Sequence, residues 1–553
     1  MSLRPRGFEE IPTATVRTAW RACPKGTRAM LIRDRLAEVF RDEDFADLYP
    51  RNGCPALSPA QLALVTVLQY TEHLSDRQAA EAVRTRIDWK YAMGLELDDP
   101  GFDHSVLCEF RARLVDGDAA DRILNLMLRH LMAAGLLAGR GRQRTDATHV
   151  LAAVRRISRL ELVGESVRAA LEELARQDPD FLAPLIQPGW DKRYGHRVEI
   201  GKVPGGAAGV TALAETFGED GRRLLTALWQ PGTPPGLRGL RQVEILRRVW
   251  THHFYWDAAG VLRWRDGHAL PPASLRFDSP YDTDAHYCVK NGLEWSGYRA
   301  HLTECCDRDR PEIVVHATAT IAPVQDGTLL DQIHTDLAAL HLLPDEHLVD
   351  AAYPTPARIA RARAAHAVTL TGPIPTASGR TAPPDPAFSK AAFTADWDTR
   401  SLTCPMGHKS LPWKTLTLNQ HPYLQASFPA DTCRTCPQRP RCTTRADRPR
   451  TVTLQPIQEL HEIQLGNWAE QHTQEWKDCY ATRAGVEALN SQAVRAFGLR
   501  RSRYRGLPKT RLQTALTAAA CNFVRVADWI RTPVRTERGP TRFHALCLTY
   551  SLT

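Results

Sequence analysis

The hydrophobic periodicity of the chain changes near residue 143, and this change constrains the fold more than any other feature. Upstream, residues 58–115 repeat apolar side chains at helical spacing, as in Leu62, Val65 and Leu68. Downstream, RTDATHVLA has the β-propensity and the alternation of a strand. Strands are also indicated by EWSGYRAHLTECC, PEIVVHATATI, HLVDAAY and AVTLTGPI, and a helix by LLDQIHTDLAALH. Strands that alternate with helices predict an α/β core.

The helical region before this core has recognisable helix starts. Ser58 is positioned to cap the first helix, and SDRQ has the form of a capping box for the second. A third helix, HSVLCEFRARL, carries Arg111 and Arg113 near its end. Three short helices joined by turns suit either a helix-turn-helix-like DNA-binding unit or a helical packing domain, and the pattern favours neither.

A chain of 553 residues is too long for a single core, so two to four domains are expected. Its hydrophobic content of 43% and charged content of 24% are ordinary for a soluble globular protein. We divide it into an N-terminal arm (1–57), a helical domain that is a candidate for DNA binding (58–135), a core (136–375) with a helical insertion at about 155–275, a linker with a Cys-rich insertion (376–456), and a helix with a basic C-terminal segment (457–553).

The chain has no apolar run of the roughly 18–20 residues that a bilayer requires. Its first residues, MSLRPRGFEEIPTATV, lack the apolar core of a secretory signal. We therefore expect a cytoplasmic protein with no membrane partner, in which the 13 cysteines are thiols or metal ligands.

Three carboxylates have the placement that two-metal phosphoryl transfer requires. Asp146 is on one predicted strand, Asp350 ends another, and Glu487 is in the middle of a helical region at roughly 457–497. Two Asp and one Glu can hold two Mg²⁺ ions, because Mg²⁺ accepts few protein oxygens and keeps its waters. Taken singly, an Asp at a strand end is usually a cap or turn residue, and a helical Glu is usually solvated.

The neighbours of Glu487 favour a functional role. Tyr480, Arg483 and Glu487 have the spacing i, i+3, i+7, which places them on one face of a helix. A hydroxyl, a guanidinium and a carboxylate on one stripe can bind phosphate and metal together. The nearby acids Asp278, Asp282 and Asp284 crowd a turn-rich DSPYDTD stretch, and we interpret them as loop or cap residues.

Four cysteines, Cys404, Cys433, Cys436 and Cys442, fall within one short segment, and two of them form a C-x-x-C pair. Four thiolates would make a closed structural zinc site, with His408 as a fifth candidate ligand. The alternative is a set of ordinary reduced cysteines. Such a zinc ion would fold a small insertion and would leave no open position for catalysis.

The excess of 71 Lys and Arg over 62 Asp and Glu is concentrated in part near the C-terminus. Residues 495–535 contain ten basic residues and one acid, directly after the helix that carries Glu487. We interpret this segment as a phosphate-contacting surface that positions DNA without reading its sequence. Its candidate DNA-binding residues are Arg495, Arg500, Arg501, Arg503, Arg505 and Lys509.

The chain resembles the DDE transposases of bacterial insertion sequences, in the branch marked by a helix signature of the form Y-(2)-R-(3)-E-(6)-K. Tyr480, Arg483 and Glu487 match its first three positions, whereas the Lys position is Val494, with Arg495 beside it. TDATHV and HLVDAAY are similar to the strands of the family's first and second catalytic Asp, and LRRSRYRGLPKTRLQTALTAAACNFVR to its tail after Glu.

The resemblance implies an RNase H-like catalytic core that hydrolyses a DNA strand at the element's end and joins the exposed 3′-OH to target DNA. It implies two Mg²⁺ ions held by Asp146, Asp350 and Glu487, with Mn²⁺ tolerated in their place. The partners it implies are double-stranded DNA, which associates the protein with the nucleoid, and a second copy, since two element ends must be brought together.

Three other functions remain open. One is a nuclease with the same core that cuts without joining, and residues alone do not distinguish it. Another is a catalytically silent, domesticated DNA-binding protein, which the absence of Lys at Val494 favours and the presence of all three carboxylates disfavours. A zinc-dependent regulator would explain only the cysteines.

Overall fold

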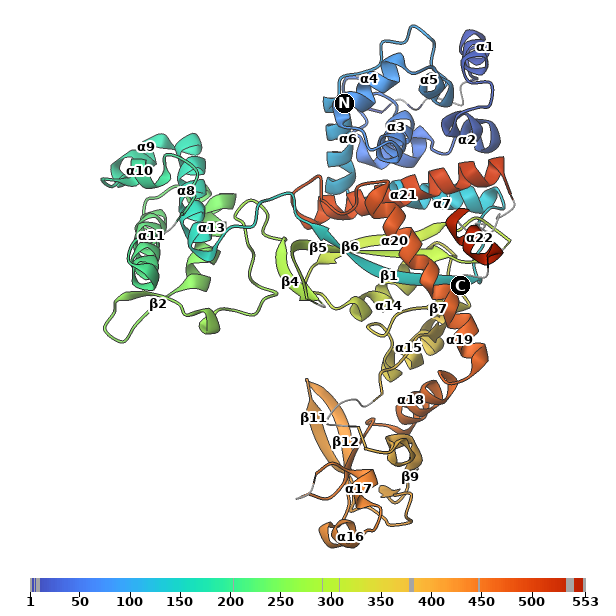
Figure 1. The fold of residues 1–553 in the computed structure, drawn as a ribbon. Coiled ribbons are helices and arrows are strands. Elements are labelled where there is room, and N and C mark those ends of the chain that lie inside the picture. Colours follow the sequence, from blue (N-terminus) through green and yellow to red (C-terminus); the bar gives the residue numbers. More distant parts are fainter. Residues whose placement is uncertain are drawn as a thin grey trace.

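The computed structural model describes residues 2–3, 5, 10–201, 203–290, 292–307, 309–376, 382–445, 448–533 and 542–550. A central sheet lies between three outer parts (Figure 1). An N-terminal helical domain covers it on one side, a helical insertion projects from a second side, and a cysteine-rich part lies at the far end. The predicted α/β class is confirmed by this mixture of helices and strands.

The central sheet contains six strands in the order β4-β5-β1-β7-β8, with β6 also paired to β5. β1 is antiparallel to β5 and parallel to β7, and β7 is parallel to β8. Every residue from Gly297 to Cys305 in β5 is buried, which is typical of a central strand covered on both faces. The strands are β1 (Arg142–Leu151), β4 (His286–Lys290), β5 (Leu293–Cys305), β6 (Val314–Ile321), β7 (Glu346–Leu348) and β8 (Thr369–Thr371).

Helix α21 (Leu507–Arg531) joins the sheet to the N-terminal domain. One side of it packs on β6 and β5, and the other on α2, α3 and α7. Because both sides are covered, the helix is buried over most of its length, including the polar Thr514, Thr517 and Asn522. The sheet is also covered by α14 (Leu330–Ala339) and α15 (Pro356–His366).

The N-terminal domain begins earlier than the predicted helical region. The segment expected as an arm contains α1 and α2, which pack on α5, and α2 also packs on α21. The predicted caps are confirmed, since Ser58 Oγ accepts from the Gln61 N–H and Ser75 forms a capping box with Gln78. The helices are α1 (Thr13–Ala22), α2 (Arg28–Leu36), α3 (Pro59–Thr71), α4 (Asp76–Thr85), α5 (Ile87–Met93), α6 (Ser105–Asp116) and α7 (Arg122–Ala133).

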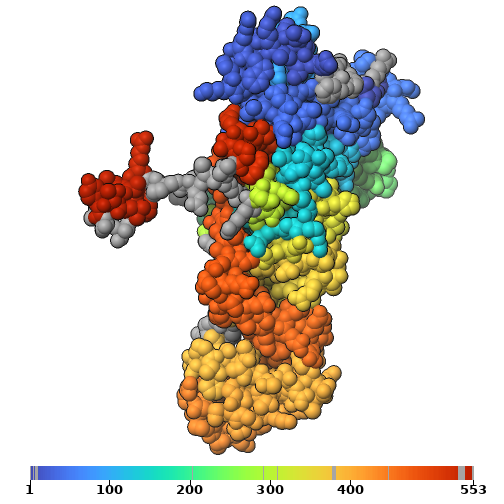
Figure 2. Space-filling model, turned by 90° about the vertical axis from the view of Figure 1, so that its right-hand side faces the viewer, coloured from blue at the N-terminus to red at the C-terminus, as the bar shows by residue number. Residues whose placement is uncertain are grey.

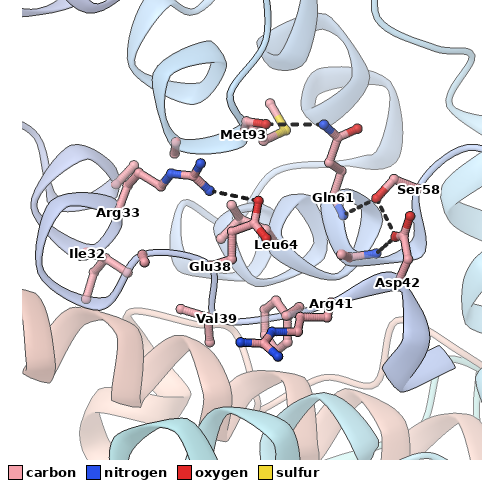
Figure 3. Close-up of a pocket in the computed structure, with 15 residues that line it drawn as sticks. Ile32, Arg33, Glu38, Val39, Arg41, Asp42, Ser58, Gln61, Leu64 and Met93 are labelled. Atoms are coloured by element: carbon pink, nitrogen blue, oxygen red, sulfur yellow. Dashed lines mark hydrogen bonds and ion pairs between the residues drawn. The ribbon is translucent and has the colours of Figure 1, made fainter. Parts of the chain in front are cut away.

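A small cavity of about 60 Å³ lies inside this domain (Figure 3). The Ser58 hydroxyl donates to Asp42 Oδ1 at 2.6 Å, and Arg33 pairs with Glu38 at 3.4 Å. Gln61 Nε2 donates to the Met93 carbonyl at 3.2 Å. These polar groups pair with one another and so link neighbouring segments of the domain. The cavity itself is too small to be a ligand site.

The helical insertion has its own core. It leaves the sheet after β1 and returns before β4, and its main helices bury Val167, Phe217, Leu224 and Leu246 against one another. A hairpin of two short strands follows the last helix. The elements are α8 (Arg159–Gln177), α9 (Pro179–Leu182), α10 (Trp190–Tyr194), α11 (Gly206–Leu228), α12 (Pro235–Arg238), α13 (Arg241–His253), β2 (Phe254–Trp256) and β3 (Leu262–Trp264).

The cysteine-rich part is mainly β-structure around a small core of Phe393, Leu402, Trp413 and Phe428. Residues 377–381 of the predicted linker lie outside the described residues. The elements are β9 (Thr394–Asp396), β10 (Ser401–Thr403), β11 (Lys414–Leu418), β12 (His421–Ser427), α16 (Ala430–Thr435), α17 (Arg439–Cys442) and β13 (Thr451–Leu454).

The helical region predicted at 457–497 is divided into shorter helices. Thr473 caps a new helix by accepting from the Trp476 N–H, and residues Thr482–Ala484 form a 3₁₀ turn. The helices are α18 (Gln458–Glu470), α19 (Gln474–Ala481) and α20 (Gly485–Arg495). The last described helix, α22 (Arg542–Thr549), projects from the side of the molecule (Figure 2). Within the described residues, no helix combines the length and apolarity needed to cross a membrane.

Candidate active site

The parallel pairing of β1 and β7 brings Asp146 and Asp350 together. The last residues paired between these two strands are Arg144 and Leu348. Asp146 lies two residues after Arg144, and Asp350 lies two residues after Leu348. Since parallel strands advance in step and alternate their side chains, residues two positions on point to the same side. The two aspartates therefore lie beside each other, Asp146 in the middle of β1 and Asp350 just beyond the end of β7.

Arg483, from the turn before α20, bridges these carboxylates. Its Nη2 lies 3.3 Å from Asp146 Oδ1 and 3.9 Å from Asp350 Oδ2. Asn490 Nδ2 donates to Asp146 Oδ2 at 3.2 Å. Backbone N–H groups of Ala147 and Ala352 donate to Asp146 and Asp350 respectively, so both carboxylates have fixed orientations.

Two polar atoms at this site have no hydrogen-bond partner within the described part of the chain. They are Arg483 Nε and Asn490 Oδ1, and both are buried. A buried donor or acceptor without a partner costs about 1–3 kcal/mol, so such atoms usually mark a place for a ligand, an ion or water. One of them is a donor suited to a phosphate oxygen, and the other is an acceptor suited to water or a cation.

The electrostatics of the site are those of a crowded carboxylate pair. Burial raises the pKa of Asp146 to about 6, and the negative charge of Asp350 acts in the same direction. The Arg483 guanidinium and the Ala147 N–H oppose this rise. Burial also raises the pKa of Tyr480; the Arg483 charge opposes this rise, and the charges of Asp350 and Asp146 add to it. Perturbed carboxylates of this kind are typical of functional sites.

Glu487 lies on the same face of α20 as Asn490, which contacts Asp146, and Arg483 lies in the 3₁₀ turn just before this helix. Positions 483, 487 and 490 have the spacing i, i+4, i+7. The side chain of Glu487 is exposed. Among the described residues, no three or more His, Cys, Asp or Glu side chains are grouped so as to hold a metal ion. The structure thus brings Asp146, Asp350, Arg483 and Tyr480 together and leaves Glu487 at their margin.

A buried ionic network fixes the start of α20 against the sheet. Arg144, on β1, pairs with Glu304 at 2.7 Å and with Glu312 at 2.8 Å. Its Nη1 donates to the Thr482 carbonyl at 2.6 Å, directly before Arg483. Gly485 follows, and a Cβ on this residue would lie 2.1 Å from Arg144 Nη1. The network positions Arg483, and no motif in the sequence indicated it.

The basic segment after α20 divides into engaged and exposed residues. Arg500 donates to the His149 carbonyl at 2.6 Å. Arg503 donates to the Leu74 carbonyl at 3.0 Å and to His73 at 2.8 Å. These contacts attach the loop to the end of β1 and to the N-terminal domain. The cations left exposed are Arg495, Arg501, Arg505 and Lys509.

The position where the resembled signature has Lys is part of the packing. Val494 packs, partly buried, against the main hydrophobic core, whereas Arg495 is exposed. The three acids interpreted as structural are all engaged: Asp278 with Ser296, Asp282 with Tyr298, and Asp284 with the Leu507 N–H.

The four cysteines of the predicted zinc site line one small cavity of about 30 Å³, together with His408. Burial raises the pKa of the Cys442 thiol, and charges on Cys433, Cys404 and Cys436 add to this rise. The four thiols thus share one cavity, although, as they stand, the described cysteines form no group that could hold a metal ion.

Sequence reasoning missed Asn490 and Lys290. Asn490 lies one turn after Glu487 on the same helical face, so its spacing was a usable signal. Lys290, on β4, lowers the pKa of Asp146 through its charge and pairs with Asp326 at 3.0 Å. No local pattern connects Lys290 with Asp146.

Comparison with known families gives two matches. Residues 403–527 match the family model described as Transposase DDE domain, and residues 22–113 match the Transposase domain (DUF772). The first includes Tyr480, Arg483 and Glu487, whereas Asp146 and Asp350 lie outside both segments. No curated protein and no solved structure matches the chain. The two matches place the chain among the DDE transposases of insertion sequences.

Proposed function

We propose that Asp146, in the middle of β1, and Asp350, just beyond β7, cut a DNA strand at each end of an insertion sequence and join the freed 3′-OH to target DNA. The observation that carries this proposal is the register that sets Asp146 beside Asp350, with Arg483 bridging them at 3.3 and 3.9 Å. A carboxylate pair beside an arginine with an unpartnered Nε suits a phosphodiester and the cations that accompany it.

The sheet supports an RNase H-like core for this enzyme. Its order, β6-β5-β1-β7-β8, combines an antiparallel meander with two added parallel strands. Asp146 is on the first strand, and Asp350 follows the strand beside it. Helix α20 then packs on β1 and presents Glu487 from the same face as Arg483 and Asn490.

The residues present fit divalent metal ions. Asp146, Asp350 and Glu487 would supply the oxygen ligands, and Asn490 Oδ1 is a free acceptor beside them. When bound, two Mg²⁺ or Mn²⁺ ions would activate the attacking oxygen and stabilise the leaving one. Arg483 pairs with the carboxylates through its Nη2, and its Nε remains available to a phosphate oxygen.

Tyr480 completes the phosphate-binding face. Its ring stacks on Trp476 with centroids 4.6 Å apart, which fixes its orientation. Burial and the two aspartates raise its pKa, so its hydroxyl stays protonated and can donate a hydrogen bond to a phosphate oxygen. Tyr480 and Arg483 thus orient the scissile group, while Asn490 holds Asp146 in place.

The exposed cations Arg495, Arg501, Arg505 and Lys509 extend this surface. Arg495 ends α20 and the other three lie in the segment after it, where they can contact the phosphates of double-stranded DNA. Since two element ends must react together, we expect two copies of the chain on the DNA.

We further propose that Cys404, Cys433, Cys436 and Cys442 hold a structural zinc ion. The support is their common cavity and the mutual effect of their charges on the pKa of Cys442. A Cys₄ set is a closed tetrahedral site, and it would stabilise a part whose own hydrophobic core is small.

The experiment that tests the catalytic proposal is a cleavage and joining assay on duplex DNA taken from both flanks of the coding sequence, with Mg²⁺. Wild type is compared with Asp146→Asn, Asp350→Asn and Glu487→Gln, and with Glu459→Gln on the exposed surface of α18 as the matched control. We expect nicking and joining in wild type and control, and neither in the three variants.

Each other outcome has a defined meaning. Cleavage retained in one of the three variants removes that residue from the site. Nicking without joining in wild type identifies a nuclease. Binding without cleavage in every sample identifies a catalytically silent DNA-binding protein. The absence of Lys at Val494 would then be the first candidate cause.

A further inference from the structure

A basic cavity lies at the base of the helical insertion, apart from the carboxylates. It has a volume of about 570 Å³ and lies between the start of α8, the end of α13, the returning segment 270–278, and Tyr287 of β4. Figure 1 shows this insertion projecting from the sheet beside β4. Arg156, Arg159 and Arg276 line the cavity, and its size is in the range of ligand sites.

Three polar atoms in its wall have no hydrogen-bond partner within the described residues. They are Arg159 Nε, Arg276 Nε and His253 Nδ1, and all three are buried. His253 is only 5% exposed to solvent. Because protein structures pair nearly all buried polar atoms, three unpartnered ones around a single cavity point to a ligand that accepts hydrogen bonds.

Aromatic contacts hold these groups in place. The Arg159 guanidinium lies 3.8 Å from the centroid of the Trp264 ring, and His253 stacks on the same ring at 5.5 Å. Arg156 lies over Tyr287 at 4.2 Å. The cavity is therefore built from oriented side chains.

The charge balance of the wall is positive. Burial lowers the pKa of Arg159, and the neighbouring Arg276 charge lowers it further. Asp278 also lines the cavity, and its carboxylate accepts from Ser296 at 2.7 Å. The negative charge of Asp266 raises the pKa of Arg159 and so opposes the effect of Arg276. Arg156 lies 3.9 Å from Glu294, and both side chains are more than half exposed.

The position of the cavity, next to the basic loop after α20, indicates which kind of anion it would bind. The chain enters the insertion directly after β1, and Leu151 at the end of β1 exchanges backbone hydrogen bonds with Arg500 and Ser502 of the basic loop. A neighbouring cavity of about 360 Å³ is lined by Arg155, Arg168, Arg197 and Arg505, with Glu165. Arginines thus continue from the basic loop into the insertion.

We infer that the cavity lined by Arg156, Arg159, Arg276 and His253 binds a phosphate of the DNA backbone outside the catalytic site. A phosphodiester supplies the acceptor oxygens that the unpartnered donors lack, and the forked guanidinium matches its geometry. The helical insertion then holds DNA beside the sheet. This inference rests on the proposed function, because it takes the partner to be DNA.

The test is binding of a duplex from the flanking DNA, measured without divalent metal so that cleavage does not enter. Arg276→Gln is compared with wild type, with Arg276→Lys, and with Arg241→Gln as the matched control at the exposed far end of α13. We expect Arg276→Gln to weaken binding about 3–10-fold at 0.15 M salt and to reduce the slope of log K against log[salt] by about 0.9, the loss of one phosphate contact. Arg276→Lys keeps the charge and should retain most of the affinity.

Equal affinity and slope in Arg276→Gln and Arg241→Gln overturn the inference. It is also overturned if inorganic phosphate raises the melting temperature of wild type but not of Arg276→Gln while DNA binding is equal, because the cavity then takes a free anion. If Arg276→Gln weakens DNA binding but wild type does not cleave DNA in Mg²⁺, this inference stands and the catalytic proposal is rejected.

Discussion

Nη2 of Arg483 lies 3.3 Å from Oδ1 of Asp146, although 337 positions separate the two residues in the chain. The same nitrogen lies 3.9 Å from Asp350 Oδ2. The arginine therefore neutralises a carboxylate pair whose members would otherwise repel each other. Its position depends on Arg144, which binds the Thr482 carbonyl just before it.

The first prediction concerns the pH dependence of cleavage. The pKa of Asp146 is raised to about 6, so its carboxylate becomes protonated as the pH falls through this value and can no longer ligate a cation. We expect Mg²⁺-dependent cleavage to decline below about pH 6. Arg483→Gln removes a charge that lowers the pKa of Asp146, so the acid limb of the profile should move to higher pH.

The measurement is the initial rate of strand cleavage between pH 5 and 9 at saturating DNA. Arg495→Gln, at an exposed arginine at the end of α20, is the control and should leave the acid limb in place. A loss of rate in Arg483→Gln without any shift of the limb would mean that Arg483 acts only on the phosphate.

The second prediction concerns zinc. Cys436→Ser removes one of the four thiols around the cavity, and a three-thiolate site binds zinc less tightly than a closed tetrahedral one. We expect one zinc ion per chain in the purified wild type by elemental analysis, loss of that zinc in Cys436→Ser, and a lower melting temperature. Cys54→Ser, an exposed cysteine of the N-terminal domain, should retain zinc. Wild type that is free of zinc and melts at the same temperature as Cys436→Ser would reject the site.

The third prediction concerns acid stability. His334 Nε2 and His347 Nδ1 lie 2.9 Å apart in the core behind Asp146. Burial lowers the pKa of His334 to about 4, against an ordinary value of 6.5, and lowers the pKa of His347 well below its ordinary value. Because the unfolded chain takes up these protons first, stability is full above pH 6.5 and is lost as the pH falls toward 4.

Each such histidine contributes a loss of about 1.4 kcal/mol per pH unit in that window. Hydrogen exchange of the β1 amides at pH 7.5 and 5.0 measures the loss in this part of the molecule. His334→Gln should flatten the dependence, and His104→Gln, which lies in the N-terminal domain, should not. An unchanged dependence in His334→Gln would assign the acid sensitivity to other groups.

The strands of the core could be predicted because β-propensity and, for β1, alternation are local signals. The same holds for Ser58 and Ser75, whose caps depend on residues within one turn. The placing of Asp146 and Asp350 side by side required one more step, namely that their strands are neighbours. The contacts of Arg483 and Asn490 required the packing of α20 on β1, which no local pattern encodes.

Tertiary packing also decided the roles of residues that are alike in sequence. Arg503 and Arg505 lie in one basic run, yet Arg503 is engaged by His73 and the Leu74 carbonyl, whereas Arg505 is exposed. The helix expected across 457–497 is interrupted because Thr473 caps a new helix and Arg144 binds the Thr482 carbonyl. The partly buried Val494 packs against the main hydrophobic core, so its position offers no cation.

The last prediction concerns Gly485, whose missing side chain makes room for Arg144. A Cβ there would lie 2.1 Å from Arg144 Nη1 and 2.3 Å from its Cζ. A flexible arginine would move aside, but this one is fixed by Glu304, Glu312 and the Thr482 carbonyl. Gly485→Ala should therefore lower stability by about 1–3 kcal/mol, as overpacking does, although alanine favours helix.

The same substitution at Gly466 is the matched control. Gly466 lies in α18, and a Cβ there meets no atom within 4 Å, so Gly466→Ala should raise stability by about 0.5–1 kcal/mol. Chemical denaturation of both variants gives the difference. Because the displaced guanidinium also positions Arg483, Gly485→Ala should reduce cleavage even where the chain is fully folded. Equal stabilisation by both substitutions would show that Arg144 is free to move and that the network does not hold α20 in place.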